Sequence, residues 1–312
     1  MTALDVGAKG AKVAGVAKKR RPKNSILNAL PWIGPALALI IAVVVWPAIE
    51  LIKISLTKIT SAGALEGFNG LENYRMLFEN PDLGAIVMRT LVWVGSVVSI
   101  TVILSMPLAQ LINQNFPGRK FVRWAMIVPW AASVVMTSIV WKWMLELTSG
   151  EFNLTLRQLG LQDQPVDWLR DPRYSFFVLI WVAVFVSIPF TTFVLLAGLQ
   201  SIPHDIIEAA QVDGATSWQI YRGIKFPLLR NALLIATIIN LINVFNSFPI
   251  IWALTRGGPG YNTDTTITFA YKMAFVEYNM GPSTALGVIN FAFIMLIVLI
   301  YLRVTKATRG QL

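Results

Sequence analysis

One polar, glycine-interrupted stretch, residues 201–229, lies between two long apolar segments and holds side chains that could take part in chemistry. It carries the acids Asp205, Glu208 and Asp213 and the only histidine of the chain, His204. The chain has no cysteine, and the spacing of these acids does not resemble a metal-binding phosphotransfer motif, so we expect no metal site. The chain also lacks the phosphate-binding sequence G-x-x-x-x-G-K-S/T, so it is not expected to hydrolyse ATP itself.

The same stretch has the signals of two short helices joined by a turn. Pro203 stands where a helix can begin without losing a needed N–H group, and Asp-Gly at 213–214 supplies a stop, because glycine adopts the left-handed conformation that commonly ends a helix. Thr216 or Ser217 can cap the second helix, which Pro227 is expected to end. Small residues on the first helix would let another protein approach closely. The alternative is an amphipathic hairpin lying at a membrane surface.

The composition is that of a membrane protein. Hydrophobic residues make up 55% of the 312 residues and charged residues only 13%, whereas soluble domains have about 25% charged residues. Six segments approach the roughly 20 apolar residues needed to cross a bilayer. They cover residues 31–52, 90–112, 121–144, 176–199, 229–254 and 283–302. The expected fold is therefore all-α, with six transmembrane helices in one domain, residues 25–312.

The distribution of basic residues favours one orientation of these helices. If the N-terminus, the connections after the second and fourth segments and the C-terminus lie on one side, that side holds 16 of the 26 Lys and Arg residues, counting Arg123 and Arg230 at the starts of the segments that follow. Because basic residues next to membrane segments are retained in the cytoplasm, both termini and residues 201–229 are expected there. Residues 1–24 are interpreted as a basic cytoplasmic tail near anionic lipid, and no nucleic-acid partner is expected.

Polar and aromatic side chains within the apolar segments suggest a path for a solute. Asn240, Asn243 and Ser247 fall at i, i+3 and i+7, so we expect them on a single helical face. The other candidates are aromatic, hydroxyl and amide side chains of the fourth and sixth segments, namely Trp181, Phe185, Thr192 and Asn290. Aromatic faces with amides and hydroxyls suit a neutral sugar. The alternative is that the polar groups only join helices and the aromatic rings only pack against lipid or the core.

Two further features of the segments bear on mechanism. No Asp, Glu, Lys or Arg lies in the middle of a segment, which argues against a proton- or sodium-coupled carrier. Five segments contain an interior proline, each expected to favour a kink: Pro47, Pro107, Pro129, Pro189 and Pro249. Kinked helices suit a bundle packed around a cavity.

Several of these residues match the pattern of a known family. Glu208, Ala209, Ala210, Asp213, Gly214 and Ala215, followed by Pro227, resemble the EAA loop of bacterial ABC importer permeases, E-A-A-x-x-D-G-A and then I-x-x-P. Residues 68–74 and 257–260 resemble the F-x-G-L-x-N-Y and G-G-P elements of carbohydrate-importer permeases of the maltose and glycerol phosphate class. The connection between the first two segments is short, whereas the best-known maltose permease carries a large extra domain there. The smaller six-span relatives are therefore the better comparison.

The resemblance implies a non-enzymatic permease subunit of an ATP-driven importer in the bacterial inner membrane. Two copies of an ABC ATPase would bind ATP and Mg²⁺, while this chain would bind no cofactor. A second EAA-loop permease would complete a heterodimeric pore, and an extracytoplasmic binding protein would deliver the substrate. The resemblance also assigns roles, with Glu208 as a charged anchor to the ATPase and Gly214 as the turn that shapes the docking helix.

The substrate is left open by these observations. A carbohydrate, and among carbohydrates a di- or oligosaccharide, is the favoured reading, with a polyol or glycerol phosphate as the alternative. A phosphorylated substrate is less favoured than a neutral one, because no buried arginine cluster is evident. A polyamine or inorganic-ion permease, a stand-alone secondary carrier and a membrane-embedded enzyme are the remaining alternatives.

Overall fold

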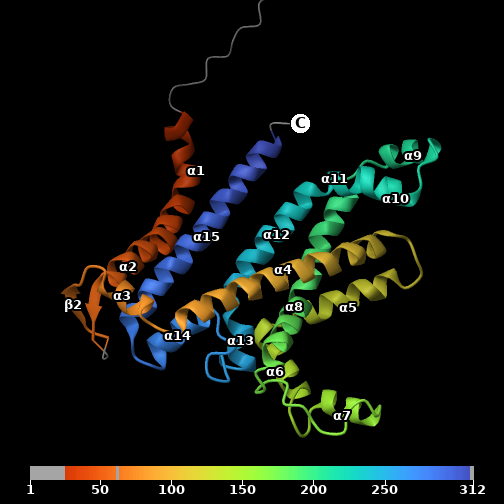
Figure 1. Ribbon diagram of the computed structural model, residues 1–312. Coiled ribbons are helices and arrows are strands. Elements are labelled where there is room, and N and C mark those ends of the chain that lie inside the picture. Colours follow the sequence, from red (N-terminus) through yellow and green to blue (C-terminus); the bar gives the residue numbers. More distant parts are fainter. Residues whose placement is uncertain (1–24, 61–62, 310–312) are drawn as a thin grey trace, which may run out of the picture. The chain divides into compact units, whose positions relative to one another are not determined.

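The computed structural model of the protein describes residues 25–60 and 63–309, which are mostly helical as expected (Figure 1). The chain divides into two compact units, Met1–Glu50 and Leu51–Leu312, and each is described by itself. The predicted basic tail, residues 1–24, lies outside the described residues. Its extent and its role stay predictions.

The described part of the first unit is one apolar helical segment. It consists of α1 (Ser25–Ile40), a π-helical turn η1 (Ile41–Val45) and the beginning of α2 (Trp46–Ser55). Pro47 lies two residues after the end of the π-helical turn, and its missing N–H cannot bond the carbonyl four residues earlier, so a widened turn is the local solution. Residues Leu30–Ser55 are long and apolar enough to cross a membrane, in agreement with the first predicted segment.

Three helices form the core of the second unit: α4 (Leu83–Asn113), α8 (Ser175–Gln200) and α12 (Arg230–Phe245). Helices α4 and α8 run parallel. Trp93 of α4 packs against Phe176 of α8. Twelve residues further along both helices, Ser105 Oγ donates to Ile188 O at 3.3 Å.

Helix α12 runs antiparallel to α4 and α8. Near the start of α4, Trp93 Nε1 donates a hydrogen bond of 3.0 Å to Val244 O near the end of α12. Near the end of α4, Ala109 shares an apolar cluster with Ala236, from the first half of α12. The three helices therefore pack over most of their length.

Two apolar clusters lie at different levels of these helices. The first contains Trp93 and Val244, and the second contains Ala109 and Ala236. In Figure 1, helices α13 and α14 lie toward the level of the first cluster, and α9, α10 and α11 lie toward that of the second. We call these two ends of the second unit the α14 end and the α9 end.

The predicted spans are only partly continuous helices. Within the described residues, four helices are long and apolar enough to cross a membrane, and the count reaches six if each of two bent helix pairs is one span. The third predicted segment is such a pair, α5 (Arg119–Ala131) and α6 (Val134–Met144), bent by 99° just after Pro129. The second segment begins earlier than expected, at Leu83, so that Arg89 lies within α4.

The fifth predicted segment, 229–254, is not one helix. Helix α12 ends at Phe245, and α13 (Phe248–Leu254) follows after a break at residues 246–247. Pro249 cannot donate a hydrogen bond to the carbonyl of Phe245, which explains why the helix stops here. By contrast, Pro107 and Pro189 lie inside the uninterrupted helices α4 and α8, so proline alone did not predict where helices break.

A small β-hairpin precedes the core and was not predicted from the sequence. Strands β1 (Thr57–Ile59) and β2 (Leu65–Phe68) pair antiparallel, and α3 (Glu72–Phe78) follows. The buried Asn73 side chain donates hydrogen bonds to Ser55 O at 2.8 Å and Thr57 O at 2.9 Å. This asparagine belongs to the 68–74 element, so its local role is to attach α3 to the hairpin.

The remaining helices complete the two ends. Helix α7 (Glu151–Gln158) follows α6, and α14 (Thr266–Phe275) leads into the long final helix α15 (Met280–Arg309). Between α8 and α12 stand α9 (His204–Val212), α10 (Ser217–Ile220), the π-helical turn η2 (Tyr221–Lys225) and α11 (Phe226–Leu228).

Buried charges hold the loop between α13 and α14. Lys272 Nζ lies 2.5 Å from Asp264 Oδ2, and Arg89 from α4 donates to Tyr261 O at 2.6 Å. Burial raises the pKa of the Asp264 carboxyl, although the hydrogen bond from Lys272 opposes this shift. Because Asp264 is fully buried, its ion pair with Lys272 is a structural requirement of this loop.

Gly257 packs directly against this carboxylate. A Cβ atom added at Gly257 would overlap the Asp264 side chain, and the backbone there has a φ of +80°. We expect Gly257→Ala to lower stability by roughly 2–4 kcal/mol, because left-handed strain adds to overpacking. The matched control is Gly260→Ala, where φ is +58° and nothing lies within 4 Å of the added atom. It should cost only about 1 kcal/mol. Thermal unfolding in detergent compares the two, and equal losses would contradict the packing argument.

Candidate functional site

The first helix of the 201–229 stretch begins and ends where the sequence predicts. Helix α9 starts directly after Pro203, and its last turn is closed by hydrogen bonds from Gly214 N to Gln211 O at 3.0 Å and from Ala215 N to Ala210 O at 2.9 Å. Gly214 has a φ of +81°, the left-handed conformation expected for a helix stop. A side chain at Gly214 would meet no atom within 4 Å, so the glycine is required by the backbone rather than by packing inside this chain.

The second helix begins with a complete capping box. Gln219 N donates to Thr216 Oγ1 at 3.4 Å, and Thr216 N donates to Gln219 Oε1 at 2.7 Å. Thr216, one of the two predicted caps, is therefore the residue that caps α10. The capping box closes the turn that begins at Gly214.

The second helix ends one residue after Pro227, close to where the sequence predicts. The helix widens into the π-helical turn η2, continues through Pro227 to Leu228, and then bends by 61° into α12. As at Pro47, a π-helical turn ends two residues before the proline, so the widened turn again accommodates the missing N–H. Leu229, at the bend, is fully buried in the second apolar cluster.

The outer face of α9 is exposed and chemically mixed. Glu208, Ala209 and Asp213 are exposed, and the Val212 side chain is 87% exposed. Glu208 Oε1 lies 3.6 Å from His204 Nδ1, its only ion-pair contact among the described residues. A solvent-facing carboxylate beside exposed alanine and valine surface is suited to contact another protein.

The two ends of this stretch are held close together at the bundle. Helix α8 leads into α9, and α12 follows α11. A Cβ atom at Gly198 of α8 would lie 2.5 Å from Ala232 Cβ of α12, so the absence of a side chain allows the two helices to approach closely. A displacement of α9–α11 would therefore act on α8 and α12 together.

The predicted solute path is not one helical face. Asn240 is buried, with an exposed fraction of 3%, and its Nδ2 has no hydrogen-bond partner, whereas Asn243 is exposed. Ser247 lies in the break between α12 and α13, so its predicted place on the face of Asn240 and Asn243 is wrong.

The other predicted path residues differ in burial. Thr192 and Asn290 are buried, and Thr192 Oγ1 and Asn290 Nδ2 have no partner among the described residues. Trp181 and Phe185 are exposed, and the Phe185 ring meets Trp141 edge-on at 5.5 Å. The Asn290 amide and the Thr192 hydroxyl are thus buried, whereas the two rings reach the surface of the chain.

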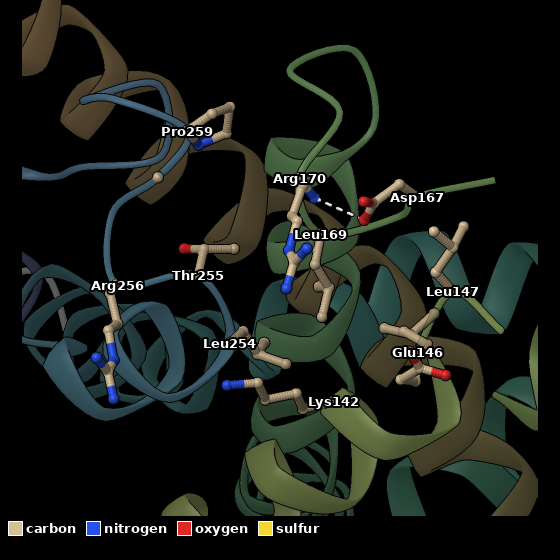
Figure 2. A pocket seen from close by; sticks show the side chains of 12 residues that line it. Lys142, Glu146, Leu147, Asp167, Leu169, Arg170, Leu254, Thr255, Arg256 and Pro259 are labelled. Atoms are coloured by element: carbon tan, nitrogen blue, oxygen red, sulfur yellow. Dashed lines mark hydrogen bonds between the residues drawn. The ribbon is translucent and has the colours of Figure 1, made fainter. Parts of the chain in front are cut away.

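A hollow at the α14 end was not found by sequence reasoning. It has a volume of about 490 Å³ and is bordered by Lys142, Arg170 and Arg256 (Figure 2). We call it the basic hollow. Its three cationic residues come from separate parts of the chain, so no local sequence pattern marks them. The described residues contain no group of three His, Cys, Asp or Glu side chains that could hold a metal ion.

Comparison with known proteins agrees with this architecture. Residues 101–310 match the family described as "Binding-protein-dependent transport system inner membrane component". The chain is 40% identical to a probable ABC transporter permease of Brucella suis over 89% of this chain and 95% of that protein. It is 32% identical to the trehalose/maltose transport system permease protein MalF of Thermococcus litoralis, over 94% of this chain and 97% of that protein.

A solved structure has the same fold. It is a chain of a bacterial ABC transporter involved in the import of the acidic polysaccharide alginate, with a TM-score of 0.78, 24% identity, and coverage of 91% of this chain and 96% of that chain. The family match, which covers more than half of the sequence, and the fold agree with each other. The chain therefore belongs to the inner-membrane components of binding-protein-dependent transport systems, as a non-enzymatic permease subunit of the carbohydrate ABC importer class.

Proposed function

We propose that this chain forms half of a heterodimeric pore through which an ATP-driven importer takes up a di- or oligosaccharide. The observation that carries the proposal is the geometry of residues 201–229. An exposed acidic and small-residue face on α9 is fixed by the left-handed turn at Gly214, and the stretch joins two tightly packed core helices. A loop that only covered the bundle would not need this arrangement.

Coupling follows from the way this stretch is attached. In our proposal the α9 end faces the cytoplasm, as do both termini, and α9 sits in a cleft of an ATPase subunit. Closure of the ATPase dimer on ATP would move α9, and the close Gly198–Ala232 contact would pass that displacement to α8 and α12. The ATPase can drive this change only if it contacts the two pore states with different free energies.

The other partners follow from the same proposal. A second EAA-loop permease completes the pore, two ATPase subunits bind ATP and Mg²⁺, and a binding protein docks at the α14 end, on the extracytoplasmic side. A saccharide is supported by similarity to a permease named for trehalose and maltose and to a chain of an alginate importer. A polyol or glycerol phosphate is the alternative substrate.

The first prediction tests docking through α9. Glu208→Arg reverses an exposed charge, and Gly214→Asp adds an acidic side chain at the turn without a clash inside this chain. Each variant should reach the membrane in normal amounts but retain at least tenfold less ATPase after purification, with uptake lost, because contacts at the centre of an interface dominate affinity. Quantitative mass spectrometry of the purified complex measures the retained ATPase.

Asp205→Asn is the matched control for these two variants. Asp205 is another exposed acid, in the first turn of the same helix, and it does not belong to the family pattern. It should retain the ATPase and support uptake at close to the normal level. Normal retention of the ATPase by both Glu208→Arg and Gly214→Asp would rule out this docking site.

The second prediction tests Asn240 as part of the solute path. Its amide is buried with an unpartnered Nδ2, so Asn240→Leu should leave stability unchanged or raise it by about 1 kcal/mol. If the amide contacts the solute during transport, uptake by the reconstituted complex should nevertheless fall roughly tenfold, the effect of about 1.4 kcal/mol. Thermal unfolding and uptake are measured on the same preparation.

Thr101→Val is the control for the Asn240 variant. Thr101 is also fully buried with an unpartnered oxygen, and it lies on α4, outside the predicted path. Its replacement should, like that of Asn240, leave stability unchanged or raise it by about 1 kcal/mol, but it should leave uptake nearly unchanged. Equal uptake by the Asn240→Leu and Thr101→Val variants would show that Asn240 serves only helix packing.

A further inference from the structure

The basic hollow joins three cationic side chains from three elements. Lys142 lies in α6, Arg170 in the loop that precedes α8, and Arg256 in the loop that follows α13. All three are exposed, and none has an ion-pair or side-chain hydrogen-bond partner among the residues that the structure describes. Their charges are therefore available to a ligand.

The two acids that border the hollow, Glu146 and Asp167, form no ion pair with these three cations. Glu146 Oε2 accepts hydrogen bonds from Ser149 N at 2.6 Å and Thr148 N at 2.9 Å, which holds the Glu146 pKa at about 2. Asp167 Oδ1 accepts from Arg170 N at 3.0 Å (Figure 2). Both carboxylates thus accept hydrogen bonds from backbone N–H groups of their own loops. In Figure 2, the Glu146 side chain points away from Arg256.

The loop that carries Arg256 is firmly attached. Thr255 and Thr263 share a hydrogen bond of 2.7 Å between their Oγ1 atoms, and Thr263 also donates to Gly258 O at 2.8 Å. Arg256 itself has a φ of +53°, an uncommon conformation for a residue other than glycine. A cationic side chain held on such a loop loses less freedom on binding a ligand than one on a mobile segment.

Most of the remaining lining is apolar. Leu145, Leu169 and Leu254 contribute to a hollow of about 490 Å³, within the range of small-molecule sites. Arginine and lysine recognise carboxylate, sulfonate and phosphate groups through charge-assisted hydrogen bonds. Leucine side chains can pack against the C–H face of a sugar ring. The hollow therefore combines recognition of an anionic group with room for the ring that carries it.

We propose that the basic hollow binds the anionic substituent of an acidic saccharide at the α14 end of this permease. This inference rests on the proposed saccharide transport and narrows the substrate to sugars that carry a negative charge. It also revises the expectation of a neutral sugar, which was based on the aromatic and polar side chains of the segments and on the lack of a buried arginine cluster. The cations of the hollow are exposed and come together only in the fold.

The test is direct binding of galacturonate and of its neutral counterpart galactose to the purified full complex in nanodiscs of zwitterionic lipid, by isothermal titration calorimetry. Galacturonate should bind saturably and at least tenfold more tightly than galactose. Arg256→Gln should lower the affinity for galacturonate about tenfold, and the double variant Lys142→Gln/Arg170→Gln should abolish galacturonate binding. The matched control Arg157→Gln, an exposed cation on α7 outside the hollow, should change nothing.

Several outcomes would overturn the inference. Equal affinity for the two sugars would contradict an anion site in the hollow. So would unchanged galacturonate binding by the hollow variants. Complete loss of galacturonate binding in nanodiscs of anionic lipid would make lipid headgroups the occupant. Normal galacturonate binding by the hollow variants, together with loss of binding-protein docking, would make the hollow a protein contact.

The test also separates this inference from the proposed function. The ATPase retained by each hollow variant reports coupling through α9, which is independent of sugar binding. If the complex retains its ATPase but does not bind galacturonate, the anion site is ruled out and the proposed coupling through α9 is not affected. Galacturonate binding that survives in Glu208→Arg complexes lacking ATPase would support the hollow even though docking is broken.

Discussion

The close packing of α8 against α12 at Gly198 and Ala232 is the contact on which the rest of the structure depends. The polypeptide leaves the bundle at the end of α8 and returns at the start of α12, and the missing side chain at Gly198 brings these two points together. The fully buried Leu229 fills the bend beside them. The stretch 201–229 is therefore attached to two helices that are tightly packed against each other.

The same packing connects the two ends of the second unit. Helix α12 touches the second apolar cluster through Ala236 and the first through Val244 and Phe245. Phe245 stacks on Phe293 of α15 at 5.2 Å, and Trp93 bonds the Val244 carbonyl. Helix α12 thus makes contacts with side chains at both ends of the second unit and with α15. In our proposal, this continuity is what would allow residues 201–229 to influence binding at the α14 end.

Sequence reasoning succeeded where the determining interactions are local. The left-handed turn at Gly214 and the cap at Thr216 depend on residues within one or two turns, and both were predicted. It failed at Ser247, because a pattern of i, i+3 and i+7 assumes a continuous helix and the break before Pro249 removes that assumption. It could not find the basic hollow, since Lys142, Arg170 and Arg256 are distant in the chain and meet only through tertiary packing.

Between the two apolar clusters lies a layer of buried polar side chains on all three core helices. Thr101 and Ser105 belong to α4, Thr191 and Thr192 to α8, and Asn240 to α12. Three of these residues keep an oxygen or nitrogen without a partner among the described residues: Thr101, Thr192 and Asn240. Each unpaired buried group costs roughly 1–3 kcal/mol, so stability alone would favour apolar residues at this level. A one-turn slip of α12 along its neighbours would move Asn240 into an apolar cluster, at a further cost in stability. The polar layer therefore fixes the register of α12, and with it the point at which residues 201–229 join the bundle.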